Sequence, residues 1–151
     1  MSAEIGSPVA GLTAPLADVP DPVFSQAMVG PGIAVKPTGG SSAAVAPIAG
    51  KIATLHPHAF VVTGRDGASV LVHLGIDTVK LHGEGFELHA AKGDQVEAGQ
   101  RIVTWNPTEV EELGYSSICP VVALEAAPES LSDFREDTQV LPGDPLFTLD
   151  T

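Results

Sequence analysis

The stretch AFVVTGRDGASVLVH, residues 59–73, holds two apolar runs on either side of a polar segment. β-Branched and other apolar residues fill 60–62 and 70–72, and the segment 64–67 between them contains glycine and aspartate. Such runs around a Gly/Asp turn are the pattern of two antiparallel strands joined in a hairpin. The hairpin is therefore the first element that the sequence predicts.

The hairpin brings two histidines together, because His58 precedes the first run and His73 ends the second. If residues 64–67 form the loop, the two histidines face each other; if Asp66 and Gly67 form a two-residue turn, the pair is diagonal. Strand side chains alternate faces with a period of two, so both registers place the imidazoles on one face, with Cβ atoms about 5 Å or roughly 7–8 Å apart. Near neutral pH such a site can act as a base, a metal ligand or a phosphoryl acceptor, and spacing alone leaves all three open.

A resemblance to a known family rests on the residues that follow. The segments HLGIDTV (73–79) and LHGEGF (81–86) resemble the phosphoacceptor segment of the IIA proteins of the glucose and N-acetylglucosamine branch of the bacterial phosphoenolpyruvate-dependent sugar phosphotransferase system. The similarity spans about residues 7–149, and it includes, in family order, VPDPVF (19–24), MVGPGIA (28–34), VKPTG (35–39), APIAGKI (46–52), HAF (58–60) and CPVV (119–122).

The resemblance implies roles for both histidines. In that family the histidine at position 73 carries the phosphoryl group as tele-phosphohistidine, and the one at position 58 stabilises and orients that group. The implied protein takes the group from HPr, passes it to the IIB domain of a sugar permease, and needs no cofactor or metal. A regulatory role, in which it binds other enzymes according to its phosphorylation state, is compatible with this.

Phosphoryl transfer between histidines depends mainly on position and electrostatics. The accepting nitrogen must be unprotonated, so His73 should be neutral, and a backbone carbonyl should hold its other nitrogen. We expect that carbonyl in the glycine-bearing segment, near Asp77 and Thr78. One departure from the family is His56, where a threonine often stands. Its imidazole either replaces the hydroxyl as a donor or lies exposed at the strand end.

By resemblance, a set of apolar residues around the pair docks partner proteins. The set is Val23, Phe24, Met28, Val29 and Leu74, with Asp21 and Asp77 as its acidic rim. We expect Phe24 and Met28 to be exposed, because they lie on a short turn that a proline starts. Apolar patches with polar rims are typical of interaction sites.

Two other functions were weighed. A zinc-dependent hydrolase could use His56, His58, His73 and Asp77, although the ligand motifs stand in the reverse of the order found in some zinc peptidases. A biotinyl or lipoyl carrier needs a lysine at a hairpin tip, and the glycine turns at 98–99 and 142–143 have none.

Composition narrows the class further. The 151 residues carry a net charge of −12, with 7 Lys and Arg against 19 Asp and Glu, which disfavours nucleic acid and favours basic partners. A single cysteine gives no disulfide framework. No apolar run approaches the roughly 20 residues of a membrane span, and the first residues lack the features of a signal peptide. We therefore expect a cytoplasmic protein.

Thirteen prolines and sixteen glycines punctuate short β-rich runs, which predicts an all-β fold: a single antiparallel sandwich or barrel-like domain with a few short helical turns. Residues 1–6 should be disordered and residues 7–151 should form the EIIA type-1 domain. Residues 95–104 and 139–148 repeat one strand–turn–strand pattern at an offset of 44. Helical turns are expected at 21–30, 106–114 and 128–134, and the expected core includes Val61, Val70, Val72, Ile102, Val121 and Val122.

Overall fold

The computed structural model describes residues 2–150, and most of their regular structure is β-strand. The largest sheet has eight strands in the order β13-β2-β3-β11-β7-β6-β5-β9. In chain order these strands are β2 (Gly11–Pro15), β3 (Gly32–Pro37), β5 (Gly50–His56), β6 (Ala59–Thr63), β7 (Ser69–His73), β9 (Gln95–Val96), β11 (Cys119–Ala123) and β13 (Gln139–Val140).

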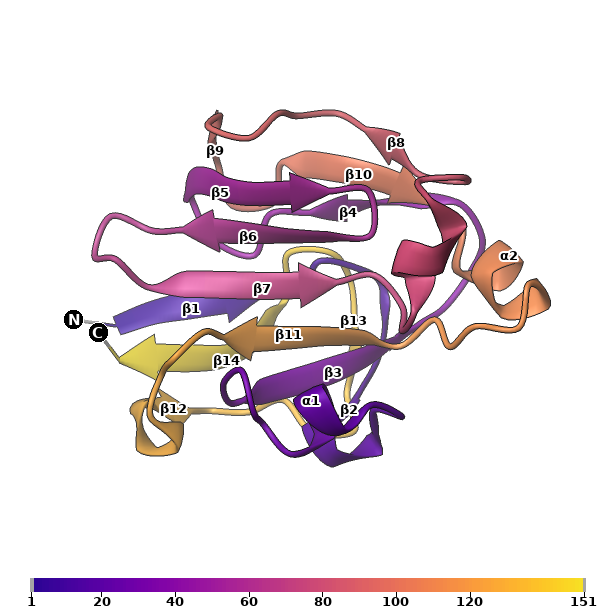
Figure 1. Ribbon diagram of the computed structural model, residues 1–151. Helices are drawn as coiled ribbons and strands as arrows, with labels where there is room; N and C mark the ends of the chain where they lie inside the picture. Colours follow the sequence, from indigo (N-terminus) through magenta and orange to yellow (C-terminus); the bar gives the residue numbers. More distant parts are fainter. Residues whose placement is uncertain (1, 151) are drawn as a thin grey trace.

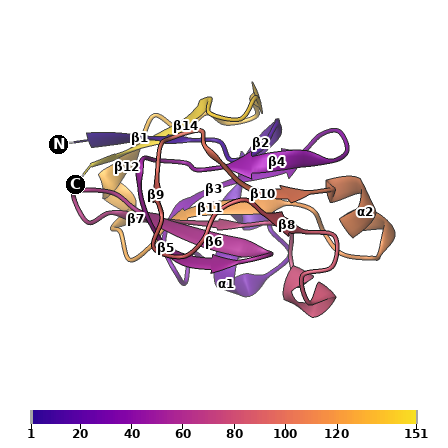
Figure 2. The same ribbon diagram turned by 90° about the horizontal axis from the view of Figure 1, so that it is seen from above.

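Two smaller sheets have the orders β1-β14-β12 and β4-β10-β8. Their strands are β1 (Ser2–Gly6), β4 (Ser42–Val45), β8 (Glu87–Leu88), β10 (Arg101–Trp105), β12 (Leu131–Ser132) and β14 (Pro145–Asp150). Neighbouring strands pair antiparallel throughout the described chain. Seen from above, β1, β14 and β4 lie on one side and β5, β6 and β7 on the other (Figure 1, Figure 2). The predicted antiparallel β-sandwich is confirmed.

The helices are short. They are α1 (Pro22–Ser25) and α2 (Pro107–Glu112), with 3-10 helices η1 (Leu16–Asp18), η2 (Thr78–Leu81) and η3 (Pro128–Ser130). In α2 the side chain of Asn106 caps the first turn by accepting a hydrogen bond from the Glu109 N–H (3.2 Å), as the sequence predicted. No helix within residues 2–150 is long and apolar enough to cross a membrane.

The other two helical turns are shorter than predicted. Helix α1 begins at Pro22, where the carboxylate of Asp21 accepts from the Val23 N–H (2.9 Å), but it ends at Ser25 rather than near Gly30. Helix η3 ends at Ser130, and the next two residues form β12. Pairing of β12 with β14 replaces the helix that local sequence favoured.

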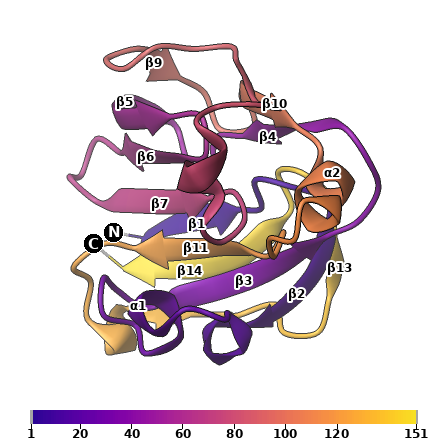
Figure 3. The same ribbon diagram turned by 45° about the vertical axis from the view of Figure 1, so that its right-hand side comes forward.

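The expected disorder of residues 1–6 is wrong for residues 2–6; residue 1 lies outside the described chain. These residues form β1, whose partners on β14 run from Ser2↔Asp150 to Ile5↔Phe147. Ser2 and Asp150, at the two ends of the described chain, consequently lie side by side (Figure 1, Figure 3). Ile5 is fully buried in the core. A strand partner more than 140 residues away stabilises this short segment, and composition does not reveal it.

Buried side chains pack on both faces of strand β11 in the large sheet. Val70, Val72, Ile102 and Val121 are fully buried between the sheets, as predicted. Val122 is equally buried but belongs to a second cluster, with Val19, Phe24, Ala34, Ile76 and Ile118, on the outer face. All five residues of β11 are therefore buried. Val61 is only partly buried, contrary to prediction, because it alternates with the inward-facing Phe60 and Val62.

The internal repeat marks two equivalent turns. The Gly99 N–H donates to the Ala46 carbonyl and the Ala46 N–H to the Gln100 carbonyl, both at 2.9 Å. In the second copy the Gly143 N–H donates to the Ser7 carbonyl (2.8 Å) and the Ser7 N–H to the Asp144 carbonyl (2.7 Å). Both glycines have positive φ, 85° and 92°. The prediction of pseudo-symmetric structural turns is confirmed.

Candidate functional site

The hairpin of β6 and β7 has a register that lies between the two predicted ones. His73 pairs with Ala59, and Thr63 pairs with Ser69. The loop therefore has five residues, 64–68, closed by a hydrogen bond from the Gly64 N–H to the Ala68 carbonyl (2.9 Å). Both predicted registers are wrong by one residue, because the sequence pattern did not show that Ala68 belongs to the loop.

His58 lies in the turn between β5 and β6 rather than in a strand. Its carbonyl accepts a hydrogen bond from the Leu74 N–H at 2.7 Å, one step beyond the last strand pair. Strict alternation would send the side chains of His58 and His73 to opposite faces, but a turn residue is free of that rule. The two rings meet edge to face, with centroids 5.3 Å apart and an interplanar angle of 68°. The prediction that the two imidazoles lie together is confirmed, although His58 reaches His73 from a turn and not from a strand.

The His73 ring is held by a backbone carbonyl. Its Nδ1 lies 2.5 Å from the oxygen of Gly75. A carbonyl can only accept a hydrogen bond, so Nδ1 carries the proton and Nε2 keeps its lone pair. The carbonyl predicted near residues 77–78 is thus two residues earlier, since the chain turns back at Gly75, where φ is +80°.

Burial governs the electrostatics of the pair. Desolvation lowers the pKa of His73, and the hydrogen bond to Gly75 and the carboxylates of Asp21 and Asp77 only partly oppose it. The pKa of His58 is lowered to about 4, first by burial and then by the neighbouring His73 and His56. Near pH 7 both rings of the pair are therefore neutral.

His56 extends the pair to a row of three imidazoles. Its ring stacks on that of His58 with centroids 5.6 Å apart and planes 20° from parallel. The side chain is exposed at the end of β5. Of the two readings left open by the sequence, the exposed strand-end position is the one found, and the ring also contacts His58.

The apolar residues expected to dock partners are not equally accessible. Val23 and Met28 are exposed, at 39% and 67%, whereas Phe24 is 7% exposed and Leu74 fully buried. The expectation that Phe24 is exposed and that Leu74 forms part of a docking surface is wrong. Both side chains are covered by the core, and the Phe24 ring packs 5.3 Å from that of His73.

The remaining members lie at different distances from the pair. Met28 and Val29 border a pocket with Ser69, at the opposite end of β7 from His73 and about 13 Å along the strand. Asp77 is exposed next to the His73 turn with φ +61°, and Asp21 caps α1. The accessible groups nearest His73 are thus acidic more than apolar.

The sequence-based prediction gave no individual role to two residues of this site, Gly75 and Thr78, although both lie in the HLGIDTV motif. Gly75 supplies the carbonyl for His73, and the buried hydroxyl of Thr78 donates to the Leu74 carbonyl (2.8 Å). A glycine two residues after a candidate histidine was a signal for the first. A Thr four residues after Leu74 was a weak signal for the second.

The zinc-hydrolase alternative lacks a ligand set. Within residues 2–150, no three or more His, Cys, Asp or Glu side chains are placed to hold one metal ion. The four residues proposed for that role therefore do not converge on a common point.

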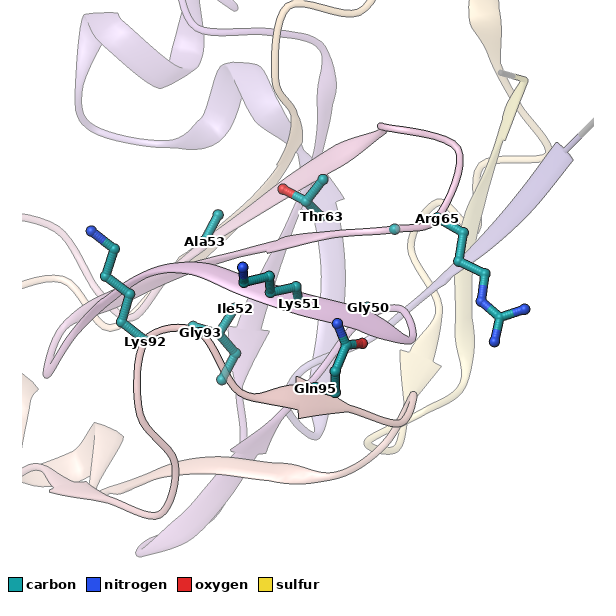
Figure 4. Close-up of a pocket in the computed structure, with 10 residues that line it drawn as sticks. Gly50, Lys51, Ile52, Ala53, Thr63, Arg65, Lys92, Gly93 and Gln95 are labelled. Carbon is teal, nitrogen blue, oxygen red and sulfur yellow. The ribbon is translucent and has the colours of Figure 1, made fainter.

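A groove of about 690 Å³ lies away from the histidines, at the other end of the β5–β6 hairpin. Figure 4 shows Lys51 and Thr63 on neighbouring strands, Lys92 before β9 and Arg65 at the far end. Neither histidine of the pair lines it, so it is not part of this site.

The fold and the site together define a class of domain: an antiparallel β-sandwich with two adjoining neutral imidazoles at one end of its large sheet. Residues 3–128 match the family model for the phosphoenolpyruvate-dependent sugar phosphotransferase system, EIIA 1, and the chain belongs to this family. It is therefore a component of the sugar phosphotransferase system.

Similar proteins agree with this assignment. A PTS system glucose-specific EIIA component of Oceanobacillus iheyensis is 40% identical over 77% of this chain and 70% of its own length. A PTS system glucosamine-specific EIICBA component of Bacillus subtilis is 40% identical over 85% of this chain but only 20% of its own length. The solved structure of glucose permease IIA from Mycoplasma capricolum matches 99% of this chain and 97% of its own, with a TM-score of 0.91 and 30% identity.

Proposed function

We propose that this protein is a phosphoryl carrier that accepts a phosphoryl group from phospho-HPr on Nε2 of His73 and passes it to a IIB domain for sugar uptake and phosphorylation. The observation that carries the proposal is the bond between His73 Nδ1 and the Gly75 oxygen. It leaves the Nε2 lone pair of a neutral ring beside the ring of His58.

The transfer needs little covalent help from the protein. The Nε2 lone pair attacks phosphorus, the bond from phosphorus to the donor nitrogen breaks, and its electron pair returns to the donor imidazole. Nδ1 keeps its proton against Gly75, so the phosphorylated ring is cationic beside the phosphoryl dianion. The carboxylates of Asp21 and Asp77, which raise the pKa of His73, favour that cationic ring.

His58 acts on the phosphoryl group after it has arrived. As a neutral ring it carries one N–H, which can donate to a phosphoryl oxygen. Removal of a donor to developing charge typically costs about 2–4 kcal/mol in transition-state stabilisation. His58 therefore stabilises transfer and does not replace His73 as acceptor.

Partners should be basic and should approach the face around Asp21 and Asp77. The net charge of −12 favours their association rate, with the exposed Val23 as an apolar contact beside Asp21 and Met28 and Val29 at the edge of the face. Relatives named EIIBCA and EIICBA components are far longer than this chain, and their names support a IIB domain as the acceptor.

We place the protein in the cytoplasm, where it meets the membrane only through the permease. Binding of other enzymes according to phosphorylation state stays a prediction.

Incubation with phosphoenolpyruvate, enzyme I and HPr tests the proposal. One acid-labile, base-stable phosphoryl group should appear on the wild-type protein and be absent from His73→Ala. The exposed His82→Asn variant is the control, since asparagine tolerates the positive φ of that position, +51°. Full labelling of His73→Ala would contradict the assignment.

A further inference from the structure

The tautomer of His73 depends on a turn that is held from several sides. The Leu74 N–H donates to the His58 carbonyl (2.7 Å), and the Ile76 N–H donates to the Ser116 carbonyl (2.9 Å). Gly75 lies between these two anchors with φ +80°, and its carbonyl faces His73. The position of that carbonyl is therefore set by the segment 74–76 as a whole.

Thr78 supplies a side-chain anchor to the same segment. Thr78 is fully buried, and its hydroxyl donates to the Leu74 carbonyl at 2.8 Å. Its methyl group lies under Gly75, where an added Cβ would come within 2.8 Å of it. Thr78 thus holds Leu74, the residue that links the backbone of His58 to His73.

We propose that Thr78 is a positioning residue for phosphoryl transfer: its hydroxyl fixes the turn at residues 74–76 so that the Gly75 carbonyl holds His73 in the Nδ1–H tautomer. The inference rests on the proposed function for its catalytic consequence, but the tautomer is measurable without any transfer. Thr78 touches neither the phosphoryl group nor the His73 ring in this role and acts through the backbone.

Three variants separate the hydroxyl from the packing. Thr78→Val keeps the size of the side chain and removes the donor, leaving the buried Leu74 carbonyl without this partner. Thr78→Ser keeps the hydroxyl and removes the methyl group. The matched control is Thr13→Val, because Thr13 is also buried (1% exposed) and hydrogen-bonded, to Arg135 and Thr138, but lies on β2, three strands from β7.

Ring ¹⁵N shifts of His73 and the rate of labelling by phospho-HPr should be measured for all three. We expect Thr78→Val to mix the two tautomers and to slow phosphorylation by about tenfold, the order expected when a buried carbonyl loses its hydrogen-bond partner. Thr78→Ser and Thr13→Val should keep the wild-type tautomer and remain within about twofold of the wild-type rate, because each retains that bond. Should Thr78→Val fail to fold, Thr78→Cys, a similar-sized side chain with a weak donor, takes its place under the same criteria.

The proposal is overturned if the valine variant has the same His73 tautomer as Thr13→Val. It is equally overturned if Thr78→Ser is as impaired as Thr78→Val, because packing and not the hydroxyl then sets the turn. A wild-type protein that is labelled elsewhere than on His73 contradicts the proposed function, while the tautomer comparison still decides the role of Thr78.

Discussion

The backbone N–H of Leu74 donates to the carbonyl of His58 over 2.7 Å, and this bond ties together the two segments that carry the site histidines. It continues the β6–β7 ladder by one step past the pair of Ala59 and His73. His58 can then turn its ring toward His73, since its own residue belongs to a turn. The pair is thus set by backbone bonds on both sides.

His58→Gln should impair delivery of the phosphoryl group more than its uptake. The variant loses a donor to the transferring group, worth about 2–4 kcal/mol, while the His73 acceptor nitrogen is untouched. Stopped-flow or quench measurements with phospho-HPr and with a IIB domain should show near-normal acceptance and steeply slowed transfer. His56→Gln is the comparison, because His56 reaches the site only by stacking on His58. Unimpaired delivery by His58→Gln would assign the second histidine a purely structural role.

Stability should fall as the pH drops from about 6.5 toward 4. The folded pKa of His58, about 4, lies below its ordinary value of 6.5, so the unfolded chain binds more protons in this window. The contribution of the neutral ring is complete above pH 6.5 and is lost on acidification, and the lowered pKa of His73 acts in the same direction. Urea unfolding at about pH 7.5 and about pH 5 measures this difference, and His58→Gln should make it smaller. An equal difference in the variant would assign the effect to other groups.

Gly75→Ala should be far more damaging than Gly99→Ala. Both glycines have positive φ, 80° and 85°, so each alanine carries backbone strain of about 1–2 kcal/mol. At Gly75 the new Cβ would also meet the Ser116 oxygen and the Thr78 methyl group at 2.8 Å, whereas at Gly99 nothing lies within 4 Å. Thermal unfolding and labelling of the two variants give the comparison. Similar losses of stability and of labelling in both variants would show that the turn at Gly75 can adjust to an added side chain.

Removal of the acidic rim should slow partner association. Asp21→Asn with Asp77→Asn lowers the negative charge beside His73 without disturbing the backbone, because asparagine also caps helices and tolerates positive φ. Association rates with HPr should fall and depend less on salt, with little change in dissociation. Asp133→Asn is the control, as Asp133 is also exposed and has positive φ (55°) but lies near η3. An unchanged salt dependence in the double variant would show that the acidic rim does not contribute to partner association.

HPr and the IIB domain should compete for one surface. Both must reach the same His73 nitrogen, and the accessible groups of the proposed docking face include the exposed Val23 and Asp77 and the partly buried Asp21. Chemical-shift mapping of each partner should perturb amides around residues 21–24 and 73–78. Observation of a ternary complex, or of HPr on the groove formed by Lys51 and Lys92, would contradict a shared surface.

The sequence was sufficient where structure is local. Apolar runs around a Gly/Asp turn predicted the hairpin, Asn106 and Pro107 predicted the start of α2, and two matching glycine turns predicted the internal repeat. Each of these depends on side chains and backbone within a few residues. The family was also identified from the sequence, since HLGIDTV is a contiguous motif and its match extends through the chain.

Only the tertiary structure decided the details of the site. The hairpin loop, residues 64–68, is longer than either predicted loop, and His58 meets His73 because it lies in a turn. Phe24 and Leu74 are buried because distant strands cover them, and β1 forms because β14 offers it an edge. The carbonyl that holds His73 belongs to Gly75 because Ser116 and Thr78 anchor that turn. These arrangements arise from contacts between residues far apart in the chain, which periodicity and local propensity do not encode.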